Sequence, residues 1–109
     1  MIDNAIIHVE MINGPILLTS GRLDQIWPSE TMANNIVTRL KANNSKFEVI
    51  HLNYEKCGHC IFGLFDSPDR LGFVETMGGK LEDNLKAVAQ NWVSTLKFLN
   101  EHLNALNEN

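Results

Sequence analysis

The alternation of apolar and polar residues divides the chain into short strands and longer helices. Residues 15–20 (PILLTS) form an apolar run followed directly by glycine, which is typical of a strand buried on both faces of a parallel sheet. Residues 47–53 (FEVIHLN) alternate apolar and polar side chains, which favours a second strand. The pattern therefore predicts two strands, with helical periodicity between and after them.

Two helices are predicted from apolar residues at helical spacing. The first covers residues 29–43, where Ser29 is a suitable N-cap and Glu30 suits the positive end of the helix dipole. The second covers about residues 82–104 and is amphipathic, so we expect its apolar stripe to pack in the core across a sheet. That stripe consists of Leu85, Ala89, Trp92, Leu96, Leu99 and Leu103.

The order strand, helix, strand indicates an α/β fold. A crossover helix of this length predicts parallel strands joined with right-handed geometry. Two strands alone are marginal in water, so the pattern looks like the edge of a larger α/β structure. Residues 54–80 form a long glycine-containing segment, and a segment of this kind is expected to be functional.

Composition and charge exclude several classes of function. Hydrophobic residues make up 44% of the 109 residues, but no apolar run is long enough to span a bilayer. The net charge is −4 and the basic residues are scattered, which argues against a nucleic-acid-binding face. The acidic residues near the N-terminus do not fit an export signal, so a cytoplasmic location is expected.

Two residues that can carry chemistry follow the two predicted strands. Asp24 comes just after residues 15–20, and His59 comes just after residues 47–53. Because sites in open α/β sheets form at the carboxyl ends of strands, we expect the two side chains to meet at one edge. A carboxylate in that position can fix the tautomer of an imidazole, which then takes a proton from a nucleophile. Taken singly, each residue is more often an ordinary loop residue.

The sequence around His59 also spells Cys57-Gly58-His59-Cys60, a thiol–disulfide redox motif. The redox interpretation lacks the context of a thioredoxin-like fold, because no later proline and strands follow at suitable positions. A zinc site would need both cysteines and two of the four histidines, and a single C-x-x-C pair is a weak signal. The histidines are His8, His51, His59 and His102. The alternative is that both cysteines are small, partly buried residues beside the loop.

Residues from Ile7 to Leu103 resemble the C-terminal half of the acyl-CoA thioesterase and bile acid-CoA:amino acid N-acyltransferase family, within the α/β hydrolases. The matching features are Val9-Glu10, Gly14-Pro15, LLTSG, Asp24, Trp27-Pro28-Ser29, Met32-Ala33, Arg39-Leu40, Tyr54, Gly58-His59, Ile61, Gly78-Gly79, Ala87, Trp92, Phe98-Leu99 and His102-Leu103. Together these spacings are more specific than the Gly-His pair alone, which is common to many α/β hydrolases.

The resemblance implies a function and a set of site residues. Asp24 would be the acid and His59 the base of a catalytic triad whose nucleophile is Ser or Cys. The substrate would be an acyl-CoA thioester, with no metal or organic cofactor. Trp27 would either wall the acyl channel or cap the edge of the core. Gly78 and Gly79 would contact substrate or form the hinge before the last helix.

The sequence departs from the family pattern in three places. No stretch fits the nucleophile elbow G-x-S/C-x-G, so residues 1–109 are expected to form a partial catalytic domain without its nucleophile-bearing half. His8 stands where the family usually has proline. Residues 60–72 lack the usual proline- and tyrosine-rich run, which bears on the shape of the acyl pocket. A non-catalytic fragment or interaction module is therefore an alternative, with self-association through an exposed sheet edge.

Overall fold

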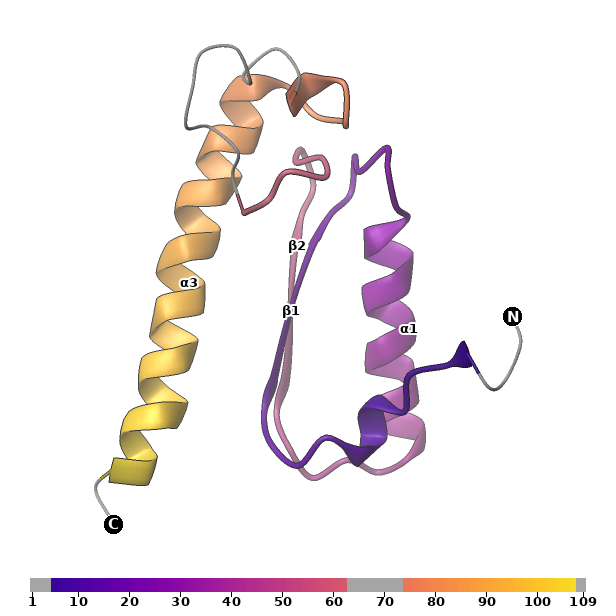
Figure 1. The fold of residues 1–109 in the computed structure, drawn as a ribbon, viewed down its shortest axis with the longest axis vertical. Coiled ribbons are helices and arrows are strands. Elements are labelled where there is room, and N and C mark those ends of the chain that lie inside the picture. The colour runs from indigo at the N-terminus through magenta and orange to yellow at the C-terminus, as the bar shows by residue number, and fades with distance from the viewer. Residues whose placement is uncertain (1–4, 63–73, 108–109) are drawn as a thin grey trace.

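The computed structural model describes residues 5–62 and 74–107, and Figure 1 shows their arrangement. A short 3-10 helix (Val9–Met11) precedes strand β1 (Ile16–Gly21), helix α1 (Ser29–Ala42), strand β2 (Val49–Tyr54) and helix α3 (Leu81–Asn107). The two predicted strands and two predicted helices are confirmed. The observed bounds differ mainly for the second strand, which begins two residues later, and for the last helix, which extends to Asn107.

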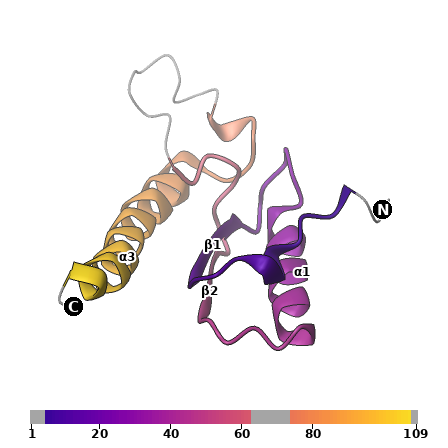
Figure 2. The same ribbon diagram turned by 60° about the horizontal axis from the view of Figure 1, so that its bottom comes forward.

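The two strands pair in parallel, as the connecting helix predicts. The register runs from Ile16 opposite Val49 to Gly21 opposite Tyr54. The carboxyl ends of both strands therefore lie at the same edge. Helix α1 covers one face of this sheet and α3 lies on the other, as Figures 1 and 2 show from two directions. The α/β class is confirmed, with both faces of the pair carrying a helix.

Helix α1 is held to its surroundings along its length. Ala33 and Leu40 are buried on its inner side. At its start, the Ser29 hydroxyl donates to the Gly21 carbonyl (3.1 Å) and accepts from the Gly21 N–H (3.2 Å). Near its end, Arg39 forms a bidentate pair with Glu10, with Nε–Oε2 at 2.5 Å and Nη2–Oε1 at 2.7 Å. These contacts fix α1 to β1 and to the 3-10 helix.

Helix α3 packs differently from the sequence-based prediction. Asn84, Ala87 and Asn91 are buried on it, whereas Trp92 is 49% exposed and Leu96 is 58% exposed. The prediction that the Trp92 stripe is core is therefore wrong for the described residues. Heptad spacing places the stripe on one face of the helix, but the sheet-facing contacts come from a different face. No element among residues 5–62 and 74–107 covers the stripe.

One cluster of buried apolar groups lies at the carboxyl end of the sheet. Cys57, Ile61 and Ala87 form a cluster against which Tyr54 packs. This cluster joins the segment after β2 to the first turns of α3. The described helices include none that is long and apolar enough to cross a membrane. Most of residues 60–72, on which the prediction about the acyl pocket depends, lies outside the described residues.

Candidate active site

Asp24 occupies a tight turn directly after β1. Its N–H donates to the Gly21 carbonyl at 3.2 Å. Its Oδ1 accepts hydrogen bonds from the backbone N–H groups of Ile26 and Trp27, each at 2.9 Å. The carboxylate is therefore held by the chain that follows it, and the side chain is only 4% exposed. This geometry aims the second oxygen, Oδ2, away from the turn.

Burial and hydrogen bonding act in opposite directions on the Asp24 carboxylate. Burial raises its pKa, but bonds from the backbone N–H groups of Trp27 and Ile26 and from the side chains of His59 and Ser29 lower it. The hydrogen bonds prevail, so the pKa of Asp24 lies below its ordinary value. Asp24 is therefore ionised at neutral pH and available to an imidazolium.

His59 lies five residues beyond the end of β2 and meets Asp24 through its side chain. The His59 Nδ1 to Asp24 Oδ2 distance is 3.2 Å, and the His59 side chain is 27% exposed. A neutral His59 donates its Nδ1 proton to the carboxylate, which leaves Nε2 as an acceptor. The sequence-based expectation that the two side chains lie together agrees with this geometry.

The segments after the two strands are joined by backbone hydrogen bonds. The Arg22 N–H donates to the Tyr54 carbonyl at 3.1 Å, and the Leu23 N–H donates to the Cys57 carbonyl at 3.0 Å. These bonds continue the pairing of β1 and β2 beyond the strands themselves. The separation between Asp24 and His59 is therefore set by backbone contacts as well as by their own side chains.

Trp27 lies beside the imidazole. The two ring centroids are 5.0 Å apart and the planes meet at 88°, an edge-to-face arrangement. Trp27 is 59% exposed, so it does not close the core in the described residues. It instead forms part of the wall next to His59. Contact between Trp27 and a substrate stays a prediction.

A cavity of about 250 Å³ opens beside these side chains. Its lining consists of Thr19, Ser20, Gly21, Asp24, Trp27, Ser29, His59, Ile61 and Phe62. Ser20, which is 1% exposed, belongs to no sequence motif. Its hydroxyl lies 2.7 Å from His51 Nε2 and donates to Asn53 Oδ1 at 2.8 Å. The shared face of the two strands was the only sequence signal for this contact.

Gly78 and Gly79 lie at a backbone junction rather than among the residues that line this cavity. Their φ angles are +105° and +76°, which favour glycine. A Cβ at Gly78 would lie 1.9 Å from the Leu23 carbonyl oxygen. Gly79 forms an antiparallel bridge with Cys57. The close packing explains why two glycines are needed here, and their contact with substrate stays a prediction.

The two cysteines of the C-x-x-C motif are free and buried. Burial, together with the neighbouring Cys60 and Asp24, raises the pKa of the Cys57 thiol to about 11. Burial also raises the pKa of Cys60. Both thiols are therefore protonated at neutral pH, which does not favour the redox interpretation. Within the described ranges, no group of three or more metal-ligating side chains is found.

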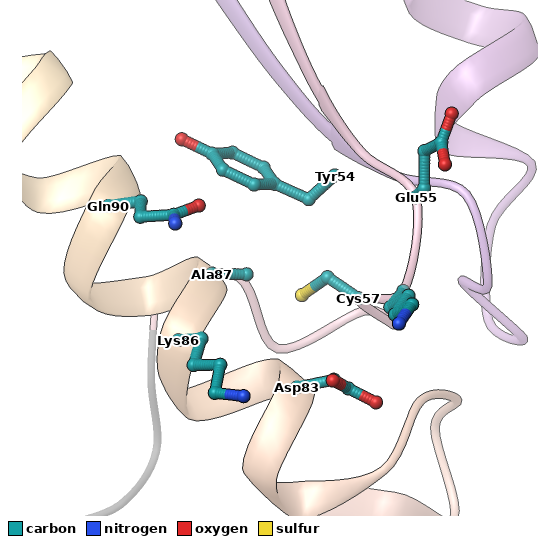
Figure 3. Close-up of a pocket in the computed structure, with 8 residues that line it drawn as sticks. Tyr54, Glu55, Cys57, Asp83, Lys86, Ala87 and Gln90 are labelled. Atoms are coloured by element: carbon teal, nitrogen blue, oxygen red, sulfur yellow. The ribbon is translucent and has the colours of Figure 1, made fainter.

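A second cavity, of about 310 Å³, lies on the α3 side of the segment after β2. Figure 3 shows the Cys57 thiol pointing toward Ala87 in this cavity, with Tyr54 and Gln90 nearby. Its charged lining residues carry opposite charges: Glu55 and Asp83 are acidic, and Lys56 and Lys86 are basic. His59 and Asp24 do not line it, so the two cavities are distinct.

Comparison with known proteins identifies the family to which this geometry belongs. The family described as "BAAT / Acyl-CoA thioester hydrolase C terminal" matches residues 2–105. The chain belongs to this family. It is also 30% identical over 106 residues to acyl-coenzyme A thioesterase 6 of Homo sapiens. This match covers 92% of the chain. The predicted membership is thus confirmed.

The match to the human relative is confined to part of that protein. The chain spans 25% of the length of acyl-coenzyme A thioesterase 6. No solved structure matches the chain. The activity of a whole thioesterase therefore does not transfer directly to these 109 residues.

Proposed function

We propose that this chain supplies the acid and the base of a nucleophile–His–Asp triad that acts on acyl-CoA thioesters. Asp24 is the acid and His59 is the base. The nucleophile, Ser or Cys, comes from outside these residues because no G-x-S/C-x-G stretch is present in the sequence. The names of the family and of the human relative support the substrate class.

The observation that carries this proposal is the hydrogen bond between Asp24 Oδ2 and His59 Nδ1 at 3.2 Å. The carboxylate is buried and anchored by two backbone N–H groups, so it fixes both the tautomer and the orientation of the ring. The opposite nitrogen, Nε2, then carries the lone pair that a general base requires. Both residues also line one cavity, which gives a substrate access to the pair.

The reaction follows from these roles. His59 Nε2 takes the proton of the nucleophile, which attacks the thioester carbonyl. The carbon–sulfur bond then breaks, and the CoA thiol leaves with the proton from His59. Next, His59 deprotonates water or an amine, which attacks the acyl-enzyme and releases the acyl group as an acid or an amide. The proton returns to the nucleophile, while Asp24 stabilises the imidazolium formed in each half-reaction.

The isolated chain is proposed to be inactive. It lacks the nucleophile, and one oxyanion-hole donor of an α/β hydrolase is the backbone N–H of the residue that follows the nucleophile. We therefore expect acyl-CoA hydrolysis by the purified chain to equal the background rate. Release of CoA thiol, followed with a chromogenic disulfide, measures this directly. Turnover above background by the pure chain would contradict the proposed division of roles.

A second candidate function is an interaction module without catalysis. The exposed apolar stripe of α3 favours it, because a contiguous bare face is typical of a surface that binds a partner. The outer edges of β1 and β2 are also unpaired among the described residues. Self-association through these surfaces would be detected as a solution mass above that of one chain.

The decisive test of the catalytic proposal uses an enzyme that contains this segment together with its nucleophile. Asp24→Asn retains the shape of the acid but removes its charge, and should lower kcat by about 10⁴-fold. Circular dichroism and the unfolding midpoint show whether the fold is retained. A folded Asp24→Asn enzyme with a kcat near that of the native protein would refute the assignment.

A further inference from the structure

The loops that carry the acid and the base share a single backbone acceptor. The Met77 carbonyl accepts from the Gln25 N–H at 3.1 Å and from the His59 N–H at 3.2 Å. Gln25 is next to Asp24 in the chain, so one carbonyl fixes the backbone beside the acid and the backbone of the base. A segment that contributes neither reacting group therefore joins both loops.

Asn84, in the first turn of α3, holds this shared acceptor in place. Its Oδ1 accepts from the Gly58 N–H at 2.9 Å, and its Nδ2 donates to the Gly78 carbonyl at 3.1 Å. Gly58 precedes His59, and Gly78 follows Met77. The Asn84 side chain is completely buried, so water does not replace these bonds.

The space around this amide is tightly filled. A Cβ at Gly79 would lie 2.3 Å from Asn84 Oδ1 and 2.8 Å from the Gly58 N. A Cβ at Gly58 would lie 1.9 Å from the Gly78 carbonyl oxygen. Backbone segments thus pack directly on each other, and small movements of Asn84 are passed to the His59 loop.

We propose that Asn84 is a positioning residue that sets the hydrogen bond between His59 and Asp24. Removing its amide leaves the Gly58 N–H and the Gly78 carbonyl buried without partners, which is costly unless the loops move. Such a movement would carry His59 away from Asp24, because Met77 and Gly78 move together. The catalytic meaning of this role rests on the proposed function, whereas the geometric role does not.

The experiment follows the His59 ring in the 109-residue chain by ¹H–¹⁵N NMR. In the native chain, we expect the neutral ring to carry its proton on Nδ1, with slow solvent exchange. Asn84→Ala should make this exchange about tenfold faster or more and should mix the two tautomers. A wild-type tautomer and exchange rate in folded Asn84→Ala would overturn the proposal.

Asn91→Ala is the matched control on the same helix. Asn91 is also fully buried, but its side chain accepts from Thr19 Oγ1 at 3.0 Å instead of contacting the two loops. It should reduce stability while leaving the His59 tautomer and exchange rate unchanged. If Asn91→Ala alters the His59 signals as much as Asn84→Ala, the role of Asn84 is merely structural.

A second variant separates the two bonds of the amide. Asn84→Asp keeps an oxygen that can accept from the Gly58 N–H but loses the donor to the Gly78 carbonyl. It should change the His59 exchange rate less than Asn84→Ala does. An equal or larger change in folded Asn84→Asp would overturn the inference that the bond from the Gly58 N–H to Asn84 helps to hold the His59 loop.

The NMR result and the proposed catalysis can fail independently. If His59 is not the base, Asn84→Ala still alters the His59 signals, while His59→Ala leaves the turnover of a nucleophile-containing enzyme near normal. If Asn84 has no positioning role, the His59 signals stay unchanged although His59→Ala abolishes turnover. In that same enzyme, Asn84→Ala should lower kcat more than it raises KM.

Discussion

Helices α1 and α3 lie on opposite faces of the same strands, and both support the candidate site with their first turn. Ser29 begins α1 and holds the end of β1 beside Asp24. Asn84, in the first turn of α3, accepts a hydrogen bond from the Gly58 N–H and so holds the loop that carries His59. The helices differ beyond these turns. Near its end, α1 is bonded to the 3-10 helix through Arg39 and Glu10, whereas α3 carries an exposed apolar stripe.

The comparison shows that two properties of a helix face are independent, namely which side chains share it and whether another element covers it. Apolar residues at helical spacing show which side chains share a face of a helix. They do not show whether any other element covers that face. On α1 the 3-10 helix and the sheet contribute the contacts, whereas on α3 the sheet-facing positions are largely polar or small.

The largest expected effect concerns the site that both helices support. In an enzyme containing this segment and its nucleophile, His59→Ala should lower kcat by about 10⁴-fold, because no other group deprotonates the nucleophile. Steady-state kinetics with an acyl-CoA thioester measures this. His102→Ala is the control, since His102 lies on α3 with Glu48 3.8 Å away and should leave kcat near normal. Equal losses in both variants would mean that the loss of kcat is not specific to His59.

The next effect concerns Cys57, which packs between the His59 loop and α3. A pKa of about 11, compared with an ordinary value of 9.0, leaves about 100-fold less thiolate at neutral pH. We expect Cys57 in the folded chain to react with a chromogenic disulfide about 100-fold more slowly than the same residue in urea, or slower still where burial blocks access. Fast reaction at pH 7 in the folded chain would instead revive a redox role for the motif.

A smaller effect is expected on the bare face of α3. If the chain self-associates through the stripe, Leu96→Glu should raise the dissociation constant about tenfold or more, because a leucine buried on association is replaced by a charge. Sedimentation equilibrium measures this. Lys97→Glu, on an exposed polar position of the same helix, should change it little. A monomeric native chain, or equal effects of both variants, would show that the stripe does not mediate association.

The smallest effect concerns the clamp on α1. Hydrogen bonding to Arg39 lowers the pKa of Glu10 from 4.5 to about 2, although burial opposes this. The folded pKa is below the unfolded one, so the stabilisation is complete above pH 4.5 and disappears as the pH falls toward 2. Urea unfolding at pH 7 and pH 3 should show a smaller pH dependence for Glu10→Gln than for the native chain. An unchanged pH dependence would mean that this pair does not stabilise the fold.

The sequence predicts the parts of the fold that depend on local pattern. The alternation around His51 and the apolar run before Gly21 indicate the strands, and the helix between them determines their parallel direction. That direction places Asp24 and His59 at the same edge of the sheet, whereas the distance between them depends on the backbone bonds of the loops after the strands. The environment of Trp92 could not be predicted, because exposure depends on which elements surround the helix.

The contacts of Asn84 and Ser20 could not be predicted from the sequence either. A buried asparagine in a helix has no periodic signature, and its partners Gly58 and Gly78 lie at separations of 26 and 6 residues. The Gly78-Gly79 pair is typical of a hinge before a helix, but it does not indicate that the Met77 carbonyl beside it accepts from both loops. Contacts of this kind depend on tertiary packing, which no local pattern encodes.

The position of Asn84 limits how the segment can be shortened or fused. Acid and base are both present by residue 59, so a fragment ending there would contain both reacting groups that this chain is proposed to supply. It would nevertheless lack the amide and the Met77 carbonyl that tie the two loops together. A minimal portable unit of this site must therefore extend through the first turns of α3, and linkers or tags are better placed after that helix than before it.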